Sequence, residues 1–373
     1  MKKKSILSVL LVLIFMFTAV LAACDDAVSE NGDTDLKSGD TLPNSEIIVP
    51  EDKTPVYLPA ELYFGKYPQS DVTAEKGEEL STAYAENLPS ADNANGWTTY
   101  GYYSEGSNDT DYMWYKDVDL NNDGEYDYRG VYFSSYRPLY TYVVGNAKNS
   151  EQDEYGYVVE TVYWFKFEPI KWRVLSVEGN KAILLSDLVL DSQEFYHDNA
   201  DREDGQVHPN NYAKSDIRAW LNGTFFNTAF NAKQKKIINT VVVDNGAGST
   251  NPDNNAECFY GGENQFACEN TSDKIWLIST QEATKTAYGF NSDYNSADSA
   301  RIKKVSDYAK CQGVDSSDTA EYLNNGYWWT RSPFCQYGVF ASYFSRDGKL
   351  NNFGDDVRGS RYGVVPAMQI TWF

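Results

Sequence analysis

Several short segments of the chain are rich in Val, Ile, Tyr, Phe and Trp and alternate apolar with polar residues. Such segments, bounded by Gly, Pro, Asn or Asp, are typical of β-strands. The strands predicted in this way span residues 62–67, 162–167, 170–175, 182–185, 274–278, 339–344 and 364–372. Turn residues at 178–180 and the dipeptide Asp347-Gly348 predict two hairpins. We expect the final strand to be paired, with the first strand as one candidate partner.

Capping residues and a helical period predict four helices among these strands. The predicted helices span residues 216–221, 232–238, 280–288 and 299–310. Ser215 and Asn231 are N-cap residue types that directly precede the first two helices. Ser279 and Glu282 have the spacing of a capping box at the start of the third, and the fourth repeats apolar residues at helical spacing. Strands and helices in this order predict an α+β fold.

The amino terminus has the parts of a bacterial lipoprotein signal. Three lysines precede an apolar run from Ile6 to Leu21, which ends in Leu21-Ala22-Ala23-Cys24. Small residues directly before a Cys form a lipobox, where the chain is cut and the Cys sulfur takes a diacylglycerol. The alternatives are an ordinary signal peptide or a membrane-spanning anchor, which needs about 20 apolar residues. We therefore expect residues 1–23 to be a signal peptide and Cys24 to carry a lipid at the outer face of the cytoplasmic membrane.

Composition separates a tether from a folded domain. Residues 24–55 are polar, acidic and poor in aromatic residues, which is typical of a flexible linker. We expect residues 56–373 to form a single domain, and the 29 Tyr and 9 Trp of the chain favour a β-rich core. Within this domain, residues 71–156 are rich in Tyr, Gly, Asn, Asp and Ser and show only weak strand signals, at 130–133 and 140–144.

The charge of the chain excludes one class of partner. The formal net charge is −22, and cleavage before Cys24 removes three lysines and no acidic residue, which makes it −25. Nucleic-acid binding needs clustered Lys and Arg, so nucleic acid is not an expected partner. An anionic membrane surface also repels such a chain, which leaves the lipid on Cys24 as the membrane anchor.

Eight short segments resemble, in order and spacing, an uncharacterised bacterial family, the domain-of-unknown-function family 6273. The segments are Phe64–Gln69, Pro169–Leu175, Leu184–Asp187, Ser215–Asn222, Phe226–Phe230, Tyr308–Gly313, Trp329–Pro333 and Gly363–Ala367. The last segment has Val365 where the family has an Arg. More distantly, the family resembles the C-type-lectin-like and formylglycine-generating-enzyme fold group. That resemblance implies a twisted antiparallel sheet with a few helices and long loops, and it makes residues 71–156 an inserted, mostly β segment.

Four cysteines remain besides Cys24, and an even number outside the cell favours disulfides. The four are Cys258, Cys268, Cys311 and Cys335. Four cysteines allow three pairings, and the sequence does not choose between them. Proximity favours Cys258–Cys268, which leaves Cys311–Cys335. The alternative is free or metal-binding thiols, although no C-x-x-C motif or clustered His supports a zinc site.

Residues 119–124, with the sequence DLNNDG, match the start of an EF-hand calcium loop, in which alternate oxygen ligands surround one cation. The candidate ligands are Asp119, Asn121, Asp123, Glu125 and Asp127. Gly124 permits the sharp turn, but Gly130 stands where the bidentate Glu belongs, and no helix flanks the loop. We therefore predict weak calcium binding, and the alternative is a polar turn between two strands.

A cluster of aromatic and basic residues near the end of the chain is a candidate ligand site. The candidate residues are Trp328, Trp329, Arg331, Arg346, Arg358 and Arg361. Adjacent residues on a strand face opposite ways, so a buried Trp329 would leave Trp328 exposed beside Arg331, at the rim of a pocket. The alternative is that both Trp residues fill the core and the Arg residues pair with acids.

These features favour a non-catalytic, lipid-anchored binding or adhesion module for a glycan, a cell-surface polymer or a surface protein. A calcium-dependent C-type lectin needs further motifs, of which Asn251-Pro252-Asp253 is only a partial match. Formylglycine-type oxidation needs two neighbouring cysteines, and Cys335 has no close partner in sequence. The two histidines, His197 and His208, lie in polar loops and are expected at the surface. The alternative function is a secreted carbohydrate- or cell-wall-active hydrolase that uses paired carboxylates.

Overall fold

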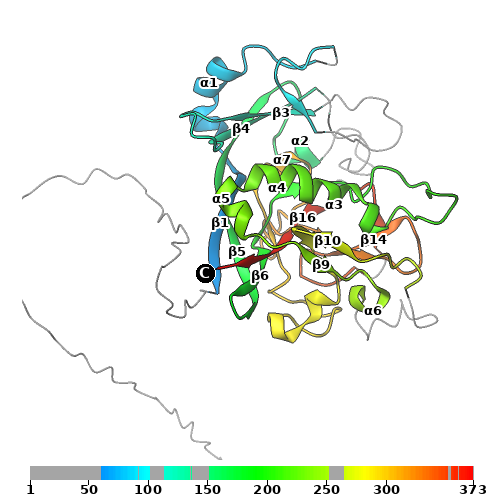
Figure 1. The fold of residues 1–373 in the computed structure, drawn as a ribbon. Helices are drawn as coiled ribbons and strands as arrows, with labels where there is room; N and C mark the ends of the chain where they lie inside the picture. Colours follow the sequence, from blue (N-terminus) through cyan, green and yellow to red (C-terminus); the bar gives the residue numbers. More distant parts are fainter. Residues whose placement is uncertain are drawn as a thin grey trace, which may run out of the picture. The chain divides into compact units, whose positions relative to one another are not determined.

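The structure is a computed structural model. It describes residues 60–90, 92–100, 113–134, 136, 151–251, 264–351, 354–359 and 361–372. All of these belong to the second of two compact units of the chain, Ser45–Phe373. The described residues form mainly antiparallel sheets with a few short helices, as Figure 1 shows. The predicted α+β class is therefore confirmed.

One long strand runs through the largest sheet. The first half of β5 (Val162–Glu178) pairs with β4 (Tyr128–Phe133), and its second half pairs with β6 (Lys181–Ser186). The strands predicted at 162–167 and 170–175 are thus a single strand. β1 (Glu61–Asp71) pairs across the junction between them, with Lys66 opposite Pro169.

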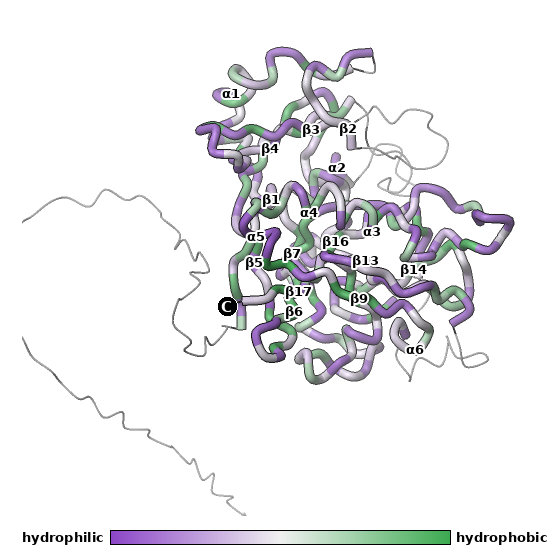
Figure 2. The backbone as a smooth tube through the Cα atoms, viewed as in Figure 1, coloured by the Kyte–Doolittle hydropathy of each residue, from purple (hydrophilic) through white to green (hydrophobic). Residues whose placement is uncertain are grey.

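The final strand pairs inside this sheet, but not with the first strand. β17 (Pro366–Thr371) lies between β6 and β11 (Ile275–Leu277). The β5–β6 hairpin, which turns at Gly179 as predicted, places β6 beside β5 and leaves the other edge of β6 for β17. The expectation that β1 is the partner of the last strand is therefore wrong. Figure 2 shows hydrophobic stretches along the central strands of this sheet.

A second sheet holds the candidate aromatic and basic residues. Its strands, in spatial order, are β15 (Asp355–Asp356), β14 (Phe340–Phe344), β13 (Trp328–Pro333), β16 (Gly363–Val364) and β8 (Asp191–Ser192). The predicted turn at Asp347-Gly348 follows β14 and lets Leu350 bridge back to Phe344. Two small pairs complete the strands: β9 (Val241–Val243) with β10 (Thr271–Asp273), and β7 (Leu188–Val189) with β12 (Lys304–Val305).

The first two predicted helices form where their caps are. Ser215 accepts the N–H of Arg218 at the start of a helical segment made of α3 (Asp216–Trp220), a π-helical turn (Leu221–Phe225) and α4 (Phe226–Ala229). Ile217, Leu221 and Phe225 lie four residues apart and are all fully buried, as expected for one face of a helix. α5 (Ala232–Ile237) begins with a capping box of Asn231 and Gln234.

The other two predicted helices are largely replaced by loops. Ser279 and Glu282 exchange the capping-box hydrogen bonds, but only two 3₁₀ turns follow, Glu282–Thr284 and Thr286–Tyr288. Residues 299–310 contain β12 and the start of α7 (Asp307–Cys311), which Ser306 caps. Arg301 explains the difference, because its buried guanidinium donates to five backbone carbonyls of the surrounding loops and holds them in irregular conformations.

In the described part of the segment 71–156, β2 (Thr98–Thr99), β3 (Met113–Val118) and β4 occur together with two unpredicted helices, and helical residues are at least as numerous as strand residues. These helices are α1 (Thr73–Tyr84) and α2 (Glu151–Glu154). The expected mostly β character of the segment is therefore not confirmed. α1 packs against β5 over a separate small core that includes Leu80 and Trp164. The ring of Trp164 lies against Gly130, where any Cβ would be 2.9 Å from the ring. The strand predicted at 140–144 lies outside the described residues.

A buried arginine joins this segment to the remainder of the unit. The Arg129 guanidinium on β4 binds both carboxylate oxygens of Asp117, at 2.6 and 2.7 Å. It also donates to the hydroxyl of Tyr308 on α7, at 2.9 Å. Because Arg129 is 2% exposed, these bonds compensate a charge that would otherwise be costly to bury. The inserted segment is therefore an integral part of the folded unit.

Candidate functional site

Trp328 and Trp329 on β13 face opposite ways, as predicted, but neither is exposed. Trp328 packs against Phe344, with ring centroids 4.8 Å apart, and its indole N–H donates to the carbonyl of Arg301. Trp329 packs against Tyr362, with centroids 4.3 Å apart. Both faces of β13 are covered, so the expectation of an exposed Trp328 is wrong. The two Trp residues fill the core instead.

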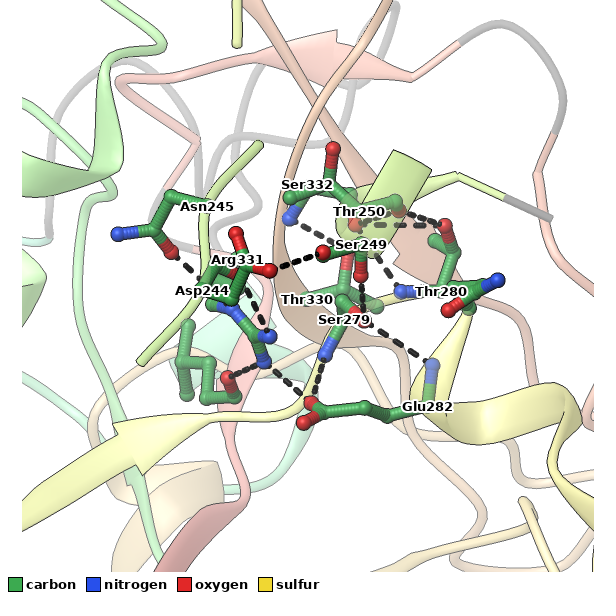
Figure 3. A network of polar contacts seen from close by, with 12 residues as sticks. Asp244, Asn245, Ser249, Thr250, Ser279, Thr280, Glu282, Thr330, Arg331 and Ser332 are labelled. Carbon is green, nitrogen blue, oxygen red and sulfur yellow. Dashed lines mark hydrogen bonds and ion pairs between the residues drawn. The ribbon is translucent and has the colours of Figure 1, made fainter. Parts of the chain in front are cut away.

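Arg331 is also buried, and protein groups bind each of its three nitrogens (Figure 3). Its Nη1 forms an ion pair with Glu282 and donates to a backbone carbonyl, that of Leu277. Its Nε donates to Asn245 at 3.2 Å, and Nη2 donates to the Asp244 carbonyl at 3.1 Å. Arg331 therefore stabilises the fold and does not line a pocket, which corrects its predicted role.

The partner of Arg331 remains charged in this interior. Burial acts to raise the pKa of Glu282, but the charge and hydrogen bond of Arg331 outweigh it, and the net pKa is lowered. Neighbouring hydroxyls extend the network in Figure 3, because Ser332 and Thr280 both donate to the carbonyl of Thr250 at the end of α6 (Ala247–Thr250). The network thus ties α6 to β13 and to the loop after β11.

Arg346 and Arg361 do come together, on a shared carboxylate. The two guanidinium groups bind the two oxygens of Asp315, one each. The side chain of Asp315 is 5% exposed, whereas those of Arg346 and Arg361 are 31% and 38% exposed. Burial acts to lower the pKa of Arg346, but Asp315 outweighs it and the pKa is raised. Two accessible cations are thus held side by side on a chain of net charge −22.

Aromatic rings adjoin this pair of arginines. The Arg346 guanidinium lies 4.8 Å from the ring centroid of Tyr327, which is half-buried. Tyr327 in turn contacts the rings of Tyr343 and Tyr362, at 5.7 and 6.0 Å. The sequence analysis missed these tyrosines and Asp315. Tyr327 directly precedes β13 and contacts the same two rings as Trp329, two residues further on. This two-residue spacing is the one signal in the sequence.

Three further pairs involve residues that the sequence analysis considered. They are Arg358–Asp356, His197–Asp216 and His208–Asp201, with nitrogen–oxygen distances of 2.8, 2.6 and 2.8 Å. Arg358 therefore does not join the other two arginines. The histidines are each about one-third exposed, and each contacts an Asp through Nδ1. For the four arginines, the alternative interpretation, pairing with acids, is what the structure shows.

The acidic loop between β3 and β4 is a hydrogen-bonded turn. The Asp119 side chain accepts the N–H groups of Asp123 and Gly124, at 3.2 and 2.8 Å, and Asp127 accepts that of Leu120. The Glu125 carboxylate instead binds other elements, described below. Across the described residues, no group of three or more His, Cys, Asp or Glu side chains is placed to hold a metal. Calcium binding by this loop stays a prediction.

The cysteines do not form the expected pairs. Cys268 and Cys311 carry thiols rather than disulfides. The pairs Cys258–Cys268 and Cys311–Cys335 are therefore not formed. Cys335 is disulfide-bonded. Burial raises the pKa of the Cys268 thiol, which makes it less reactive. The proximity of two cysteines in sequence was thus a poor guide to disulfide pairing.

Two expected features fall on parts of the chain that are not described. Both Cys24, the predicted lipid attachment site, and Cys258 lie outside the described residues. Among the helices that the structure does describe, none has the length and apolar character needed to cross a membrane.

One protein-family model matches the part of the chain that holds these arginines. Residues 179–372 match the sequence model of DUF6273, a domain of unknown function. The chain belongs to this family. The DUF6273 match contains Asp315, Arg331, Arg346 and Arg361, but it begins after β5, so β1 and the acidic loop lie outside it. No curated protein and no solved structure matches the chain.

Proposed function

We propose that this DUF6273 protein is a lipid-anchored binding or adhesion module outside the cytoplasmic membrane, and that it binds an acidic glycan or another acidic cell-surface polymer. The observation that carries this proposal is the pair Arg346 and Arg361, held on Asp315 beside Tyr327. Guanidinium groups bind carboxylate and phosphate through paired N–H donors. An aromatic ring next to them offers a surface for the apolar face of a sugar.

The surroundings of one carboxylate, Asp356, support binding over hydrolysis. A glycosidase needs two carboxyl groups on either side of the bond, one of them with a raised pKa. Burial raises the pKa of Asp356, but Arg358 donates to both of its oxygens, at 2.9 and 2.8 Å. A carboxylate that is occupied in this way is poorly placed to donate a proton to a substrate. The secreted hydrolase is therefore the second choice.

The proposal includes a C-type-lectin-like architecture and a lipid anchor on Cys24. Antiparallel sheets, short helices and long loops fit a C-type-lectin-like architecture, whereas the separation of β1 from β17 by β5 and β6 departs from it. The lipobox supports attachment through Cys24. Changing Cys24→Ser is expected to release the protein from the membrane fraction, and unchanged fractionation would remove the lipid anchor from the proposal.

A glycan array that contains carboxylated, sulfated, phosphorylated and neutral members tests the binding function. We expect the acidic members to be retained without release of a smaller product, and the signal to fall with added salt. Arg346→Gln and Arg361→Gln, made singly so that Asp315 keeps one partner, should each weaken binding about tenfold. Lys76→Gln, which removes the same charge from the exposed face of α1, is the control.

If Arg346→Gln and Arg361→Gln both bind the acidic members as well as the wild type and Lys76→Gln do, the site is refuted. Release of product from an acidic oligosaccharide would replace the binding module with the hydrolase.

A further inference from the structure

A small pocket lies where β1, the acidic loop and the α4–α5 segment meet. Its volume is about 150 Å³. Six of the residues that line it are Lys66, Glu125, Tyr126, Phe167, Asn227 and Gln234. Ligand sites for drug-sized molecules occupy roughly 300–1,000 Å³, so this pocket admits one small ring rather than an oligomer.

Two features hold the walls of the pocket together. Gly65 has a φ of +72°, and a Cβ at this position would lie 2.6 Å from the carbonyl oxygen of Ala229. Glycine therefore allows β1 to approach the end of α4 closely. On the other side, the Glu125 carboxylate binds Lys66 at 2.7 Å and accepts a hydrogen bond from Asn231 at 2.9 Å. The pocket is thus formed in advance by segments that are distant in sequence.

The charges in the pocket cancel. The hydrogen bond from Lys66 is the largest cause of a lowered pKa at Glu125, and the hydrogen bond from Asn231 adds to it. Glu125 is therefore ionised near neutral pH, and its ion pair with Lys66 has no net charge. The pair itself therefore offers no net counter-charge to a charged ligand.

The remaining lining groups suit a sugar. Tyr126 is 41% exposed, and its ring contacts that of Phe167 with centroids 5.7 Å apart, so the ring is supported by a neighbour and is also partly accessible. The Gln234 carbonyl oxygen accepts the N–H of Asn231 in the capping box, which leaves the amide NH₂ for a ligand. Asn227 adds an exposed carboxamide, whose oxygen accepts a hydrogen bond from Lys235 at 3.1 Å and whose NH₂ group is left for a ligand. Aromatic rings with neutral donors and acceptors match the apolar face and the hydroxyls of a pyranose.

We propose that this pocket binds one neutral sugar residue, which stacks on Tyr126 and hydrogen-bonds to Asn227 and Gln234. The site does not depend on Arg346 and Arg361. Its β1, acidic-loop and β5 residues lie outside the family match at 179–372, whereas Asn227 and Gln234 lie inside it. The N-terminal half of the chain therefore adds a binding site to the DUF6273 domain.

Saturation-transfer NMR with methyl glycosides tests this site. The probes are methyl β-glucoside, methyl α-mannoside and methyl β-N-acetylglucosaminide at millimolar concentration, with a methyl glucuronide as the charged comparison. We expect transfer to at least one neutral glycoside and less to the glucuronide. Tyr126→Ala should reduce the transfer at least about fivefold, Asn227→Ala should reduce it partly, and Tyr126→Phe, which keeps the ring, should retain it.

Tyr337→Ala is the matched control, because Tyr337 is 56% exposed and packs with Phe334 and Phe340 rather than at the pocket. Arg346→Gln should leave neutral glycoside binding intact, which separates this site from the acidic one. The absence of transfer to all three neutral glycosides, or equal transfer in wild type and a folded Tyr126→Ala, would overturn the proposal. Preferred binding of the glucuronide would also overturn it.

Discussion

Arg331 and the pair Arg346–Arg361 lie in the same family domain, and the structure gives them opposite surroundings. Arg331 is 2% exposed, and its three nitrogens bind Glu282, Asn245 and backbone carbonyls. Arg346 and Arg361 share one carboxylate and remain about one-third exposed. The comparison teaches that the number of protein acceptors around a guanidinium, and its burial, separate a structural arginine from one that is open to a ligand.

The largest expected effect comes from removing the buried charge. Arg331→Met leaves the largely buried Glu282 without its counter-ion and the other acceptors of Arg331 without a donor, and it should lower the free energy of unfolding by about 3–5 kcal/mol. Urea unfolding at pH 7 measures this loss. Arg346→Met is the matched substitution at the exposed pair. If the two variants lose the same stability, the distinction between the two kinds of arginine fails.

A second prediction concerns Glu282, the carboxylate partner in the same ion pair. The folded-state pKa of Glu282 lies below its ordinary value of 4.5, so its contribution is fully present above that pH and is lost as the pH falls through the folded-state pKa. At pH 7, Glu282→Gln should lower the free energy of unfolding by about 1.5–3 kcal/mol. The gap to wild type should narrow as the pH falls below 4.5. A gap that is constant between pH 7 and 3 would contradict the ion pair.

The exposed pair should behave differently. Arg346→Gln leaves Asp315 bound to Arg361 and removes a side chain that is partly solvated, so the loss should be no more than about 1 kcal/mol. The same variant should lose affinity for acidic glycans. Thermal melting and array binding on one preparation measure both effects. A stability loss as large as that of Arg331→Met would show that Arg346 is structural as well.

The smallest expected effect concerns the acidic loop. Its carboxylates are partly or fully exposed, as the two arginines of the preceding comparison partly are. If the loop binds calcium with a dissociation constant of roughly 10⁻⁴–10⁻³ M, calcium at about five times that value should raise the free energy of unfolding by about 1 kcal/mol. Asp123→Ala should abolish the rise in melting temperature, while the exposed Asp318→Ala should not. An identical melting curve with and without calcium would leave the loop as a polar turn.

Several signals that lie within a few residues gave correct predictions, although the capping box of Ser279 and Glu282 is followed only by 3₁₀ turns. The capping residues Ser215 and Asn231 start helices as predicted, and the turns at Gly179 and Gly348 follow the expected strands. The helix α1 was missed because it buries only Leu80, which gives no helical period to detect. The helix predicted at 299–310 failed because Arg301 binds distant backbone carbonyls, and no local pattern reports such contacts.

By itself, the sequence determined the α+β class, the positions of long strands such as β1, β5 and β17, and the membership in DUF6273. The tertiary structure decided which candidate residues are buried and which meet. Arg331 pairs with Glu282, 49 residues away in the sequence, and Arg361 pairs with Asp315, 46 residues away. Strand and cap signals are local because backbone conformation depends on neighbouring residues. Burial and ion pairing depend on contacts between distant segments, and one acid among the 54 in this chain becomes a partner only when the fold places it there.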